Sequence, residues 1–203
     1  MKSFILIMFI AVTTVVAVTD ADKNAEKLVQ AALRQIGVTN YYDPAYVKLK
    51  YPGGDVPSDR GVCTDVVIRA YRTLGIDLQK LVHEDMLSNF KLYPKHWGLR
   101  RTDKNIDHRR VPNLQKFFER RGASLEVTKN PKDYLPGDIV TWNLRGATRG
   151  LGLPHIGIVS DQLSNDGTPL IIHNIGSGAC LEDVLFDFHI TGHYRFMLSK
   201  HKN

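Results

Sequence analysis

The strongest constraint on the fold is a change of residue pattern near Gly122, which divides the chain into a helical half and a strand half. Before Gly122 the apolar residues recur at spacings of three and four, the pattern of amphipathic helices. After it come short runs rich in β-branched residues, separated by glycine, proline, asparagine and aspartate. Helices followed by strands predict an α+β fold, with N-terminal helices packed on a C-terminal antiparallel β-sheet.

The same patterns give approximate element positions. Helices are expected over residues 25–36, 63–74, 78–90 and 112–121. Strands are expected over residues 124–127, 138–142, 156–160, 170–174 and 192–198. The chain has 203 residues and no internal repeat or linker, so one domain accounts for it.

Residues 1–21 have the pattern of a secretory signal peptide. Lys2 precedes an apolar run, and Ala17 and Ala21 provide small residues at two possible cleavage positions. The run is shorter than the roughly 20 apolar residues that cross a bilayer, and no other stretch is long enough. We therefore expect residues 22–203 to form a single domain that is exported to the periplasm or outside the cell, with no transmembrane segment after cleavage.

The charge of the chain bears on its partners. Its formal net charge is +6 at pH 7, and it stays positive when Lys2 is removed with the signal peptide. A basic protein favours anionic surroundings such as cell wall or lipid headgroups. Export argues against a nucleic-acid partner, and the sequence does not indicate an oligomeric state.

Cys63 stands at the start of a predicted helix, in the stretch SDRGVCTDVVIRAYR. The first turn of a helix presents unpaired N–H groups and the positive end of the helix dipole, and both favour a thiolate. A nucleophile also needs a base, so the position alone equally suits a small buried side chain. Because an exported protein can hold disulfides, a bond between Cys63 and Cys180 is a further alternative.

Two histidines of the strand half are candidates for the base. His155 begins the strand of PHIGIVSD and shares a face with Gly157, which leaves room beside the imidazole. His173 ends the strand of LIIHNIG, and antiparallel pairing would bring it beside His155. One ring nitrogen of His173 would then orient His155.

A zinc site assembled from Cys63, His155 and His173 would have suitable ligand types. No close-spaced pair such as C-x-x-C or H-E-x-x-H accompanies these residues, and no phosphate-binding glycine loop is present. We therefore expect neither a metal nor a cofactor.

Taken together, the segments GVCTDVV, LPGDIVTW, PHIGIVSD and LIIHNIG resemble the NlpC-type papain-like cell-wall cysteine peptidases. Their order and character match over roughly two thirds of the chain, from Cys63 to the C-terminus. With the stretch NIDHRRVPNL, the sequence is most similar to a subfamily of small secreted bacterial proteins known as a domain of unknown function.

This resemblance implies a papain-like fold and a Cys-His-His site. Cys63 would be the nucleophile, His155 the base and His173 the residue that orients the base. Asn174 is the alternative orienting residue, but neighbouring strand residues point to opposite faces, so only one can serve, and we favour His173. The implied activity is hydrolysis of an amide bond in peptidoglycan peptide stems. A free Cys63 is then required, since a sulfur in a disulfide cannot attack.

Five residues are expected to contact the substrate: Tyr41, Asp65, Arg109, Arg110 and Asn174. Arg109 or Arg110 could hold a carboxylate by two parallel hydrogen bonds, although a solvated basic loop is the other interpretation of this stretch. A tyrosine of the loop over residues 41–51 could stabilise the oxyanion together with the backbone N–H of Cys63.

Two other functions are open at this stage. A non-catalytic module that binds the cell wall would keep the fold and the basic cleft but would not need Cys63. A papain-like acyltransferase would use the same thiol and base and pass the acyl group to an amine or an alcohol.

Overall fold

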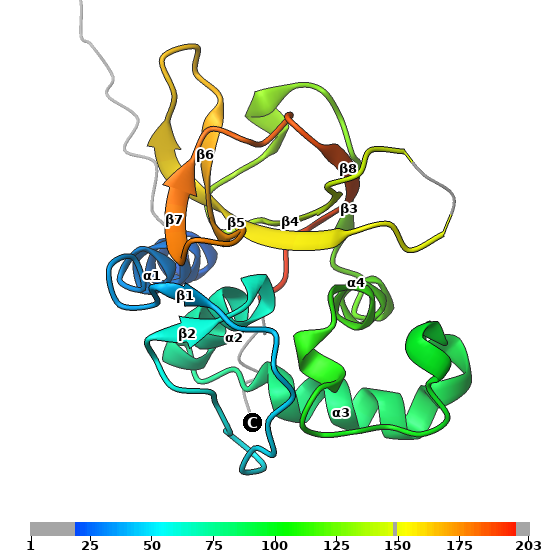
Figure 1. Cartoon of the computed structure of the whole chain (residues 1–203). Helices are drawn as coiled ribbons and strands as arrows, with labels where there is room; N and C mark the ends of the chain where they lie inside the picture. Colours follow the sequence, from blue (N-terminus) through cyan, green and yellow to red (C-terminus); the bar gives the residue numbers. More distant parts are fainter. Residues whose placement is uncertain (1–18, 148–149, 198–203) are drawn as a thin grey trace, which may run out of the picture.

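The computed structural model describes residues 19–147 and 150–197. Within them, helices and an antiparallel sheet form the predicted α+β fold (Figure 1). The α-helices are α1 (Asp20–Leu33), α2 (Cys63–Thr73), α3 (Leu78–Asn89) and α4 (Val111–Arg120). Short 3-10 turns are η1 (Phe90–Leu92), η2 (His96–Gly98), η3 (Asp107–Arg109) and η4 (Pro131–Asp133). The predicted signal peptide lies outside the described residues, apart from residues 19–21.

The first helix begins and ends earlier than the pattern predicts. Thr19 caps it, because the Thr19 hydroxyl accepts from the Asp22 N–H and the Asp22 carboxylate accepts from the Thr19 N–H. It ends at Leu33, and the turn that follows places Gly37 at a φ of +77°. No helix in the described ranges has the length and apolar character needed to cross a membrane.

The main sheet has six strands in the order β3-β8-β4-β5-β6-β7, and every neighbouring pair is antiparallel. These strands are β3 (Ser124–Leu125), β4 (Ile139–Asn143), β5 (Pro154–Leu163), β6 (Pro169–Asn174), β7 (Ala179–Glu182) and β8 (His189–Tyr194). A separate parallel pair joins β1 (Tyr41–Tyr42) and β2 (Arg60–Gly61). The sequence did not predict β1, β2 or β7, and it placed β8 too late, at 192–198, of which residue 198 lies outside the described part.

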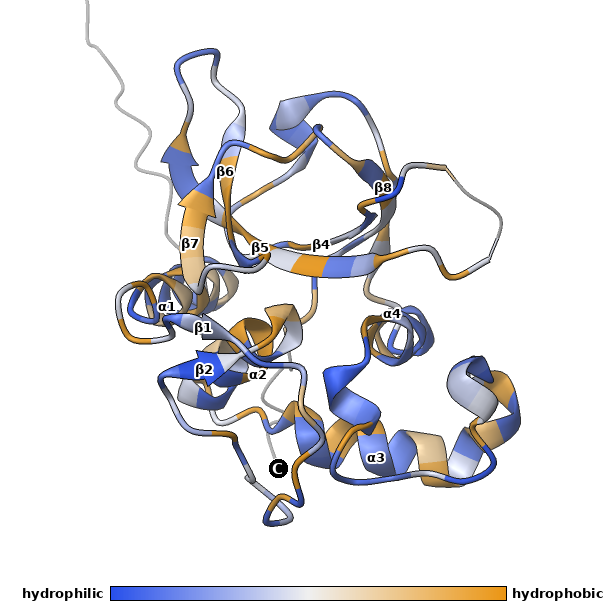
Figure 2. Cartoon of the chain, in the orientation of Figure 1, coloured by the Kyte–Doolittle hydropathy of each residue, from blue (hydrophilic) through white to orange (hydrophobic). Residues whose placement is uncertain are grey.

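Each face of the main sheet has its own apolar core. On one face Ile156, Ile158 and Ile172 pack with the buried sides of α1, α2 and α4. On the other face Trp142 and Val159 pack with residues of the loops that precede β4 and β8. Figure 2 shows the hydrophobic residues of α2 next to the strands that it covers. This packing fixes the start of α2, and therefore Cys63, against the first residues of β5.

Candidate active site

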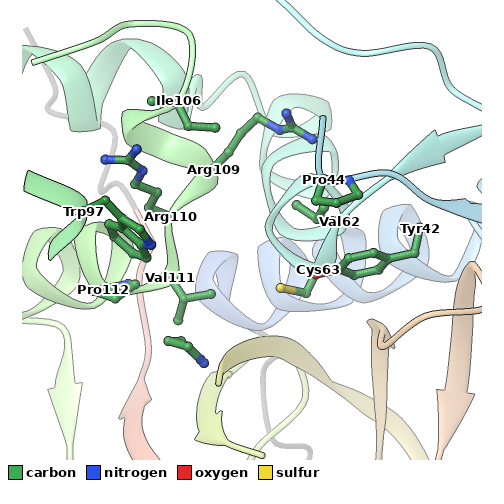
Figure 3. A pocket seen from close by; sticks show the side chains of 11 residues that line it. Tyr42, Pro44, Val62, Cys63, Trp97, Ile106, Arg109, Arg110, Val111 and Pro112 are labelled. Carbon is green, nitrogen blue, oxygen red and sulfur yellow. The ribbon is translucent and has the colours of Figure 1, made fainter. Parts of the chain in front are cut away.

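Cys63 is the first residue of α2, as predicted, and lines a cavity of about 170 Å³. Only 4% of the residue is exposed, and its sulfur is directed toward the cavity (Figure 3). The backbone N–H groups of Ile156, Thr64 and Cys63 itself lie close enough to this sulfur to lower its pKa. The thiol therefore lies between the start of a helix and the start of β5.

Burial decides the charge state of this thiol. Desolvation raises the pKa of Cys63 to about 12, although the three backbone N–H groups act in the opposite direction. The resting residue is thus a neutral thiol at pH 7. The sequence argument, that the start of the helix favours a thiolate, underestimated the cost of removing the charged sulfur from water.

The two histidines named from the sequence lie side by side on β5 and β6. Nε2 of His155 is 2.8 Å from Nδ1 of His173, and the two rings meet edge to face. His155 is 3% exposed and His173 is fully buried. The second nitrogen of His173, Nε2, lies 2.9 Å from Oε2 of Glu182 on β7. The result is a continuous hydrogen-bonded chain from a half-exposed carboxylate to a buried imidazole.

The carboxylate sets the tautomer of both rings. An ionised Glu182 can only accept, so Nε2 of His173 carries a hydrogen and Nδ1 of His173 has a free lone pair. That lone pair accepts from Nε2–H of His155. The remaining nitrogen of His155, Nδ1, is consequently without a hydrogen and can accept a proton.

Burial keeps both imidazoles neutral at pH 7. It lowers the pKa of His155 to about 3, and the neighbouring His173 contributes in the same direction. Burial also lowers the pKa of His173, although the hydrogen bond and the charge of Glu182 partly offset this. The hydrogen-bonded pair of histidines therefore offers a neutral base and carries no positive charge at pH 7.

The geometry of the resting state does not join the thiol to the base. Within residues 19–147 and 150–197, no hydrogen bond connects Cys63 with His155. The start of β5 is nevertheless close to the thiol, because Pro154 lines the cavity of Cys63 and the Ile156 N–H lowers the pKa of its sulfur. His155 lies between these two residues in the sequence, and strand alternation directs its side chain to the face opposite Ile156, where its ring lies 6.0 Å from that of Trp142.

Asp65 and Arg109 form a buried ion pair beside the cavity. Nε and Nη2 of Arg109 each lie 2.9 Å from a carboxylate oxygen of Asp65, and the side chains are 2% and 4% exposed. Asp65 also accepts from the Val62 N–H, and Arg109 donates to the carbonyls of Asp43 and Ala45. These contacts tie the start of α2 to the loop after β1, so both predicted substrate contacts are occupied within the protein.

Arg110 is the arginine that remains available at the cavity. Its guanidinium lies 4.6 Å over the ring of Trp97 (Figure 3). Nη1 of Arg110 is buried and has no hydrogen-bond partner among the described residues. Trp97 has a φ of +60°, which is rare and strained outside glycine. A strained aromatic residue that packs against a guanidinium with an unsatisfied N–H group is typical of a binding site.

Tyr42, and not Tyr41, lines the cavity with Cys63. Successive strand residues point to opposite sides, and Tyr41 is 61% exposed. Burial, and to a lesser degree Cys63, raises the pKa of Tyr42 to about 12, so its hydroxyl stays protonated. The sequence named Tyr41 as a substrate contact, and the structure places its neighbour Tyr42 at the cavity instead.

Asn174 lies on the face of β6 opposite to His173, and its side chain connects neighbouring segments of the protein. Its Nδ2 donates to the Gly61 carbonyl, and its Oδ1 accepts from the N–H groups of Gly176 and Gly178. The amide is therefore fully engaged in joining β6 to β2 and to the loop before β7. Of the two alternatives for contacting His155, the structure places His173 there.

Both cysteines are free thiols, so the alternative of a Cys63–Cys180 disulfide is not found. Cys180 lies on β7 opposite His173, and its sulfur is 3.7 Å from the His173 carbonyl. Burial and the neighbouring Glu182 raise the pKa of the Cys180 thiol to about 11. The zinc ligand set considered from the sequence, which combined Cys63 with both histidines, is not assembled in the described residues.

Glu182 and Trp97 are candidate site residues that sequence reasoning missed, and in place of Tyr42 it named the neighbouring Tyr41. Glu182 belongs to a short strand that follows a glycine-rich turn, so no apolar run marked it. The only available signal was its spacing, since Cys180 and Glu182 are two residues apart and share a strand face. Trp97 lies in a 3-10 turn without any motif.

Fold and site together define an α+β protein in which a cysteine at a helix start lies near the first residues of β5, the strand that carries one member of a carboxylate-linked histidine pair. Residues 29–196 match the family described as "Domain of unknown function (DUF1287)", and the chain belongs to this family. It is 58% identical over 171 residues to "Uncharacterized protein YijF" from Escherichia coli strain K12, covering 84% of this chain and 81% of that protein. The narrower family resemblance seen in the sequence is thereby confirmed.

Proposed function

We propose that the protein is an NlpC-type, papain-like cysteine hydrolase that cleaves an amide bond in peptidoglycan peptide stems. Cys63 is the nucleophile, His155 the base and His173 the residue that orients the base. The observation that carries the proposal is the chain from Glu182 through His173 to His155, because it leaves Nδ1 of His155 free to accept a proton.

Because Cys63 and His155 are both neutral before the reaction, their charge states define the order of the reaction steps. As the Cys63 sulfur attacks the amide carbon, its proton moves to Nδ1 of His155, and the carbonyl oxygen becomes an oxyanion. His155 then gives this proton to the leaving amine, and a thioester to Cys63 remains. Water, deprotonated by His155, attacks the thioester, and the acid product and the free thiol are released. The hydrogen bond from thiol to base forms when the substrate is bound, as is common for catalytic contacts that are long in the free enzyme.

The oxyanion is stabilised at the start of α2. The Cys63 N–H belongs to the first turn of α2, where N–H groups have no partner within the helix, and we assign it to the adjacent oxyanion. The Tyr42 hydroxyl lines the same cavity and remains a donor at neutral pH. Tyr42 thereby takes the role that the sequence suggested for a tyrosine of this loop.

Substrate recognition uses the guanidinium of Arg110, whose Nη1 has no hydrogen-bond partner among the described residues. Peptide stems carry carboxylates, and a planar guanidinium binds them through two parallel hydrogen bonds. The Trp97 ring supports Arg110 from one side, while Ile106 and Val111 provide apolar walls. Arg109 contributes indirectly, because it fixes the loop that carries Tyr42.

An exported protein would meet such a substrate in the cell wall, and we propose that residues preceding α1 act as the signal peptide. The capping box of α1 favours cleavage after Ala17 over cleavage after Ala21. Cleavage after Ala17 keeps Thr19 and its hydrogen bonds with Asp22, whereas cleavage after Ala21 removes the cap.

The test is incubation of the purified mature protein with peptidoglycan-derived peptides, with and without an added amine acceptor. Mass spectrometry of the products separates the three functions. New carboxyl termini that require Cys63 support hydrolysis, whereas transfer to the added amine identifies an acyltransferase, which the apolar cavity walls would also suit. Binding without a product, unchanged in Cys63→Ser, would contradict the proposal and favour a non-catalytic module.

A further inference from the structure

A second group of reactive side chains lies at the edge of the sheet, on the opposite side of His173 from His155. One ligand atom each from His173, Cys180 and Glu182 lies within 4.8 Å of the others. His173 pairs with Cys180 in the register of β6 and β7, and Glu182 is two residues further on, so the three side chains share one face. The proposed mechanism does not use Cys180.

The donor set matches the preferences of zinc. Imidazole nitrogen, thiolate sulfur and carboxylate oxygen are its three common protein ligands, and a fourth position is often taken by water. Exposure increases along the group, from a fully buried His173 through a half-buried Cys180 to a Glu182 side chain that is 44% exposed. Because β7 is the last strand of the sheet, a cation can enter from solvent at this edge. The ligands converge across two strands, which explains why no close-spaced motif in the sequence indicated them.

We propose that His173, Cys180 and Glu182 form a binding site for Zn²⁺ and that the bound ion switches the active site off. The binding site depends only on these three residues. Its effect on catalysis rests on the proposed function of Cys63 and His155.

The switch follows from the tautomers of the two rings. When Zn²⁺ binds Nε2 of His173, the hydrogen on that atom is displaced, and the neutral ring carries its hydrogen on Nδ1 instead. Nδ1–H of His173 then donates to Nε2 of His155, so the hydrogen of His155 resides on Nδ1. That atom can no longer accept the proton of Cys63. The number of protons is conserved. The Cys180 thiol proton is released to solvent, the hydrogen on Nε2 of His155 moves to Nδ1 of His173, and the hydrogen lost from Nε2 of His173 is replaced by one on Nδ1 of His155.

Binding is tested with Co²⁺ as the probe, on the full mature chain carrying Cys63→Ser so that Cys180 is the remaining thiol. We expect one equivalent to give a thiolate-to-cobalt absorption band in the near ultraviolet, which Zn²⁺ abolishes by competition. The band should disappear with Cys180→Ser, and Glu182→Gln should weaken Co²⁺ binding at least about tenfold. Asp183→Asn, at the neighbouring exposed carboxylate, is the matched control and should bind normally. No band, or a band that survives Cys180→Ser, would overturn the site.

The switch is tested by the ratio of hydrolysis rates without and with Zn²⁺. We expect a ratio of at least about ten in the parent chain, reversal by a chelator, and a ratio near one in Cys180→Ser. A site that binds Co²⁺ in a protein whose hydrolysis is insensitive to Zn²⁺ would overturn the switch. Co²⁺ binding in a protein without any Cys63-dependent product would instead contradict the proposed function while supporting the metal site.

Discussion

Nε2 of His155 and Nδ1 of His173 lie 2.8 Å apart, and this contact links the interior of the candidate site to the edge of the sheet. Beyond it, His173 donates to a carboxylate that reaches solvent. The group that is bound to Nε2 of His173 therefore determines which nitrogen of His155 holds a hydrogen. The two proposals above are two consequences of this single contact.

Glu182→Gln should lower the rate of the Cys63-dependent reaction by about tenfold to a hundredfold, because an amide can donate to His173 and allow the inactive tautomer. Glu182→Asp, which keeps the carboxylate, should restore part of the rate. The measurement is the rate of product formation, with folding checked by circular dichroism. Asp183→Asn provides the control, and a Gln variant as active as the parent would show that the carboxylate does not orient the base.

Arg110→Ala should raise KM about tenfold for peptides with a carboxylate near the scissile amide, since a charge-assisted contact is lost, and should change kcat much less. Amidated versions of the same peptides should lose this difference. Arg100→Ala, on the exposed segment after η2, is the matched control. If the alanine variant discriminates between acidic and amidated peptides as the parent does, Arg110 does not bind the carboxylate.

Asp65→Ala should destabilise the fold by about 3 to 5 kcal/mol, because it leaves the buried Arg109 guanidinium unpaired and removes the acceptor of the Val62 N–H. Urea unfolding followed by tryptophan fluorescence measures this change. For comparison, Asp59→Ala removes an ion pair with Arg60 at the surface and should leave the unfolding midpoint nearly unchanged. Similar midpoints for the two variants would contradict the structural role of Asp65.

His108 should make the fold sensitive to mild acid. Burial lowers the pKa of His108 to about 3, the charges of Arg72, Arg109 and His83 add to this, and Asp103 opposes it. The unfolded chain binds a proton near its ordinary pKa of about 6.5 while the folded chain does not, so stability falls as the pH drops below that value. For this group the loss between pH 7 and pH 5 is about 2 kcal/mol.

The effect of His108 is isolated by comparing urea unfolding of the parent chain and of His108→Gln at these two pH values. The glutamine variant should lose less stability on acidification, because all other groups are common to both proteins. Equal losses would mean that His108 is protonated in the folded state or plays no part in acid sensitivity.

The parts of the site that follow from local pattern were predictable. Alternation along a strand placed His155 and His173 on a common face, and the change of pattern at Cys63 marked the start of α2. Tyr42 could not be selected over Tyr41, because a two-residue strand has no apolar pattern that reveals its inward side. Glu182 was missed because its strand was missed, and the strand forms only through pairing with β6.

The different roles of Arg109 and Arg110 could not be predicted from the sequence either. The two are neighbours and chemically identical, and only the tertiary structure pairs Arg109 with Asp65, more than forty residues away in the chain. The charge state of Cys63 depends in the same way on burial, which a helix pattern does not report. Long-range packing therefore determines the roles of residues that local sequence patterns identify only as candidates.

The most direct test of the central claim is the rate at which iodoacetamide alkylates Cys63 at pH 7, in a Cys180→Ser background. His155→Gln removes the base while filling much of its space, so access to the buried sulfur is largely preserved. We predict that this variant reacts at least about tenfold more slowly, because in the parent chain the imidazole takes the thiol proton as the sulfur attacks iodoacetamide, the same step that it performs when the sulfur attacks an amide. Equal rates in the two proteins would show that His155 does not act on Cys63 and would contradict the account.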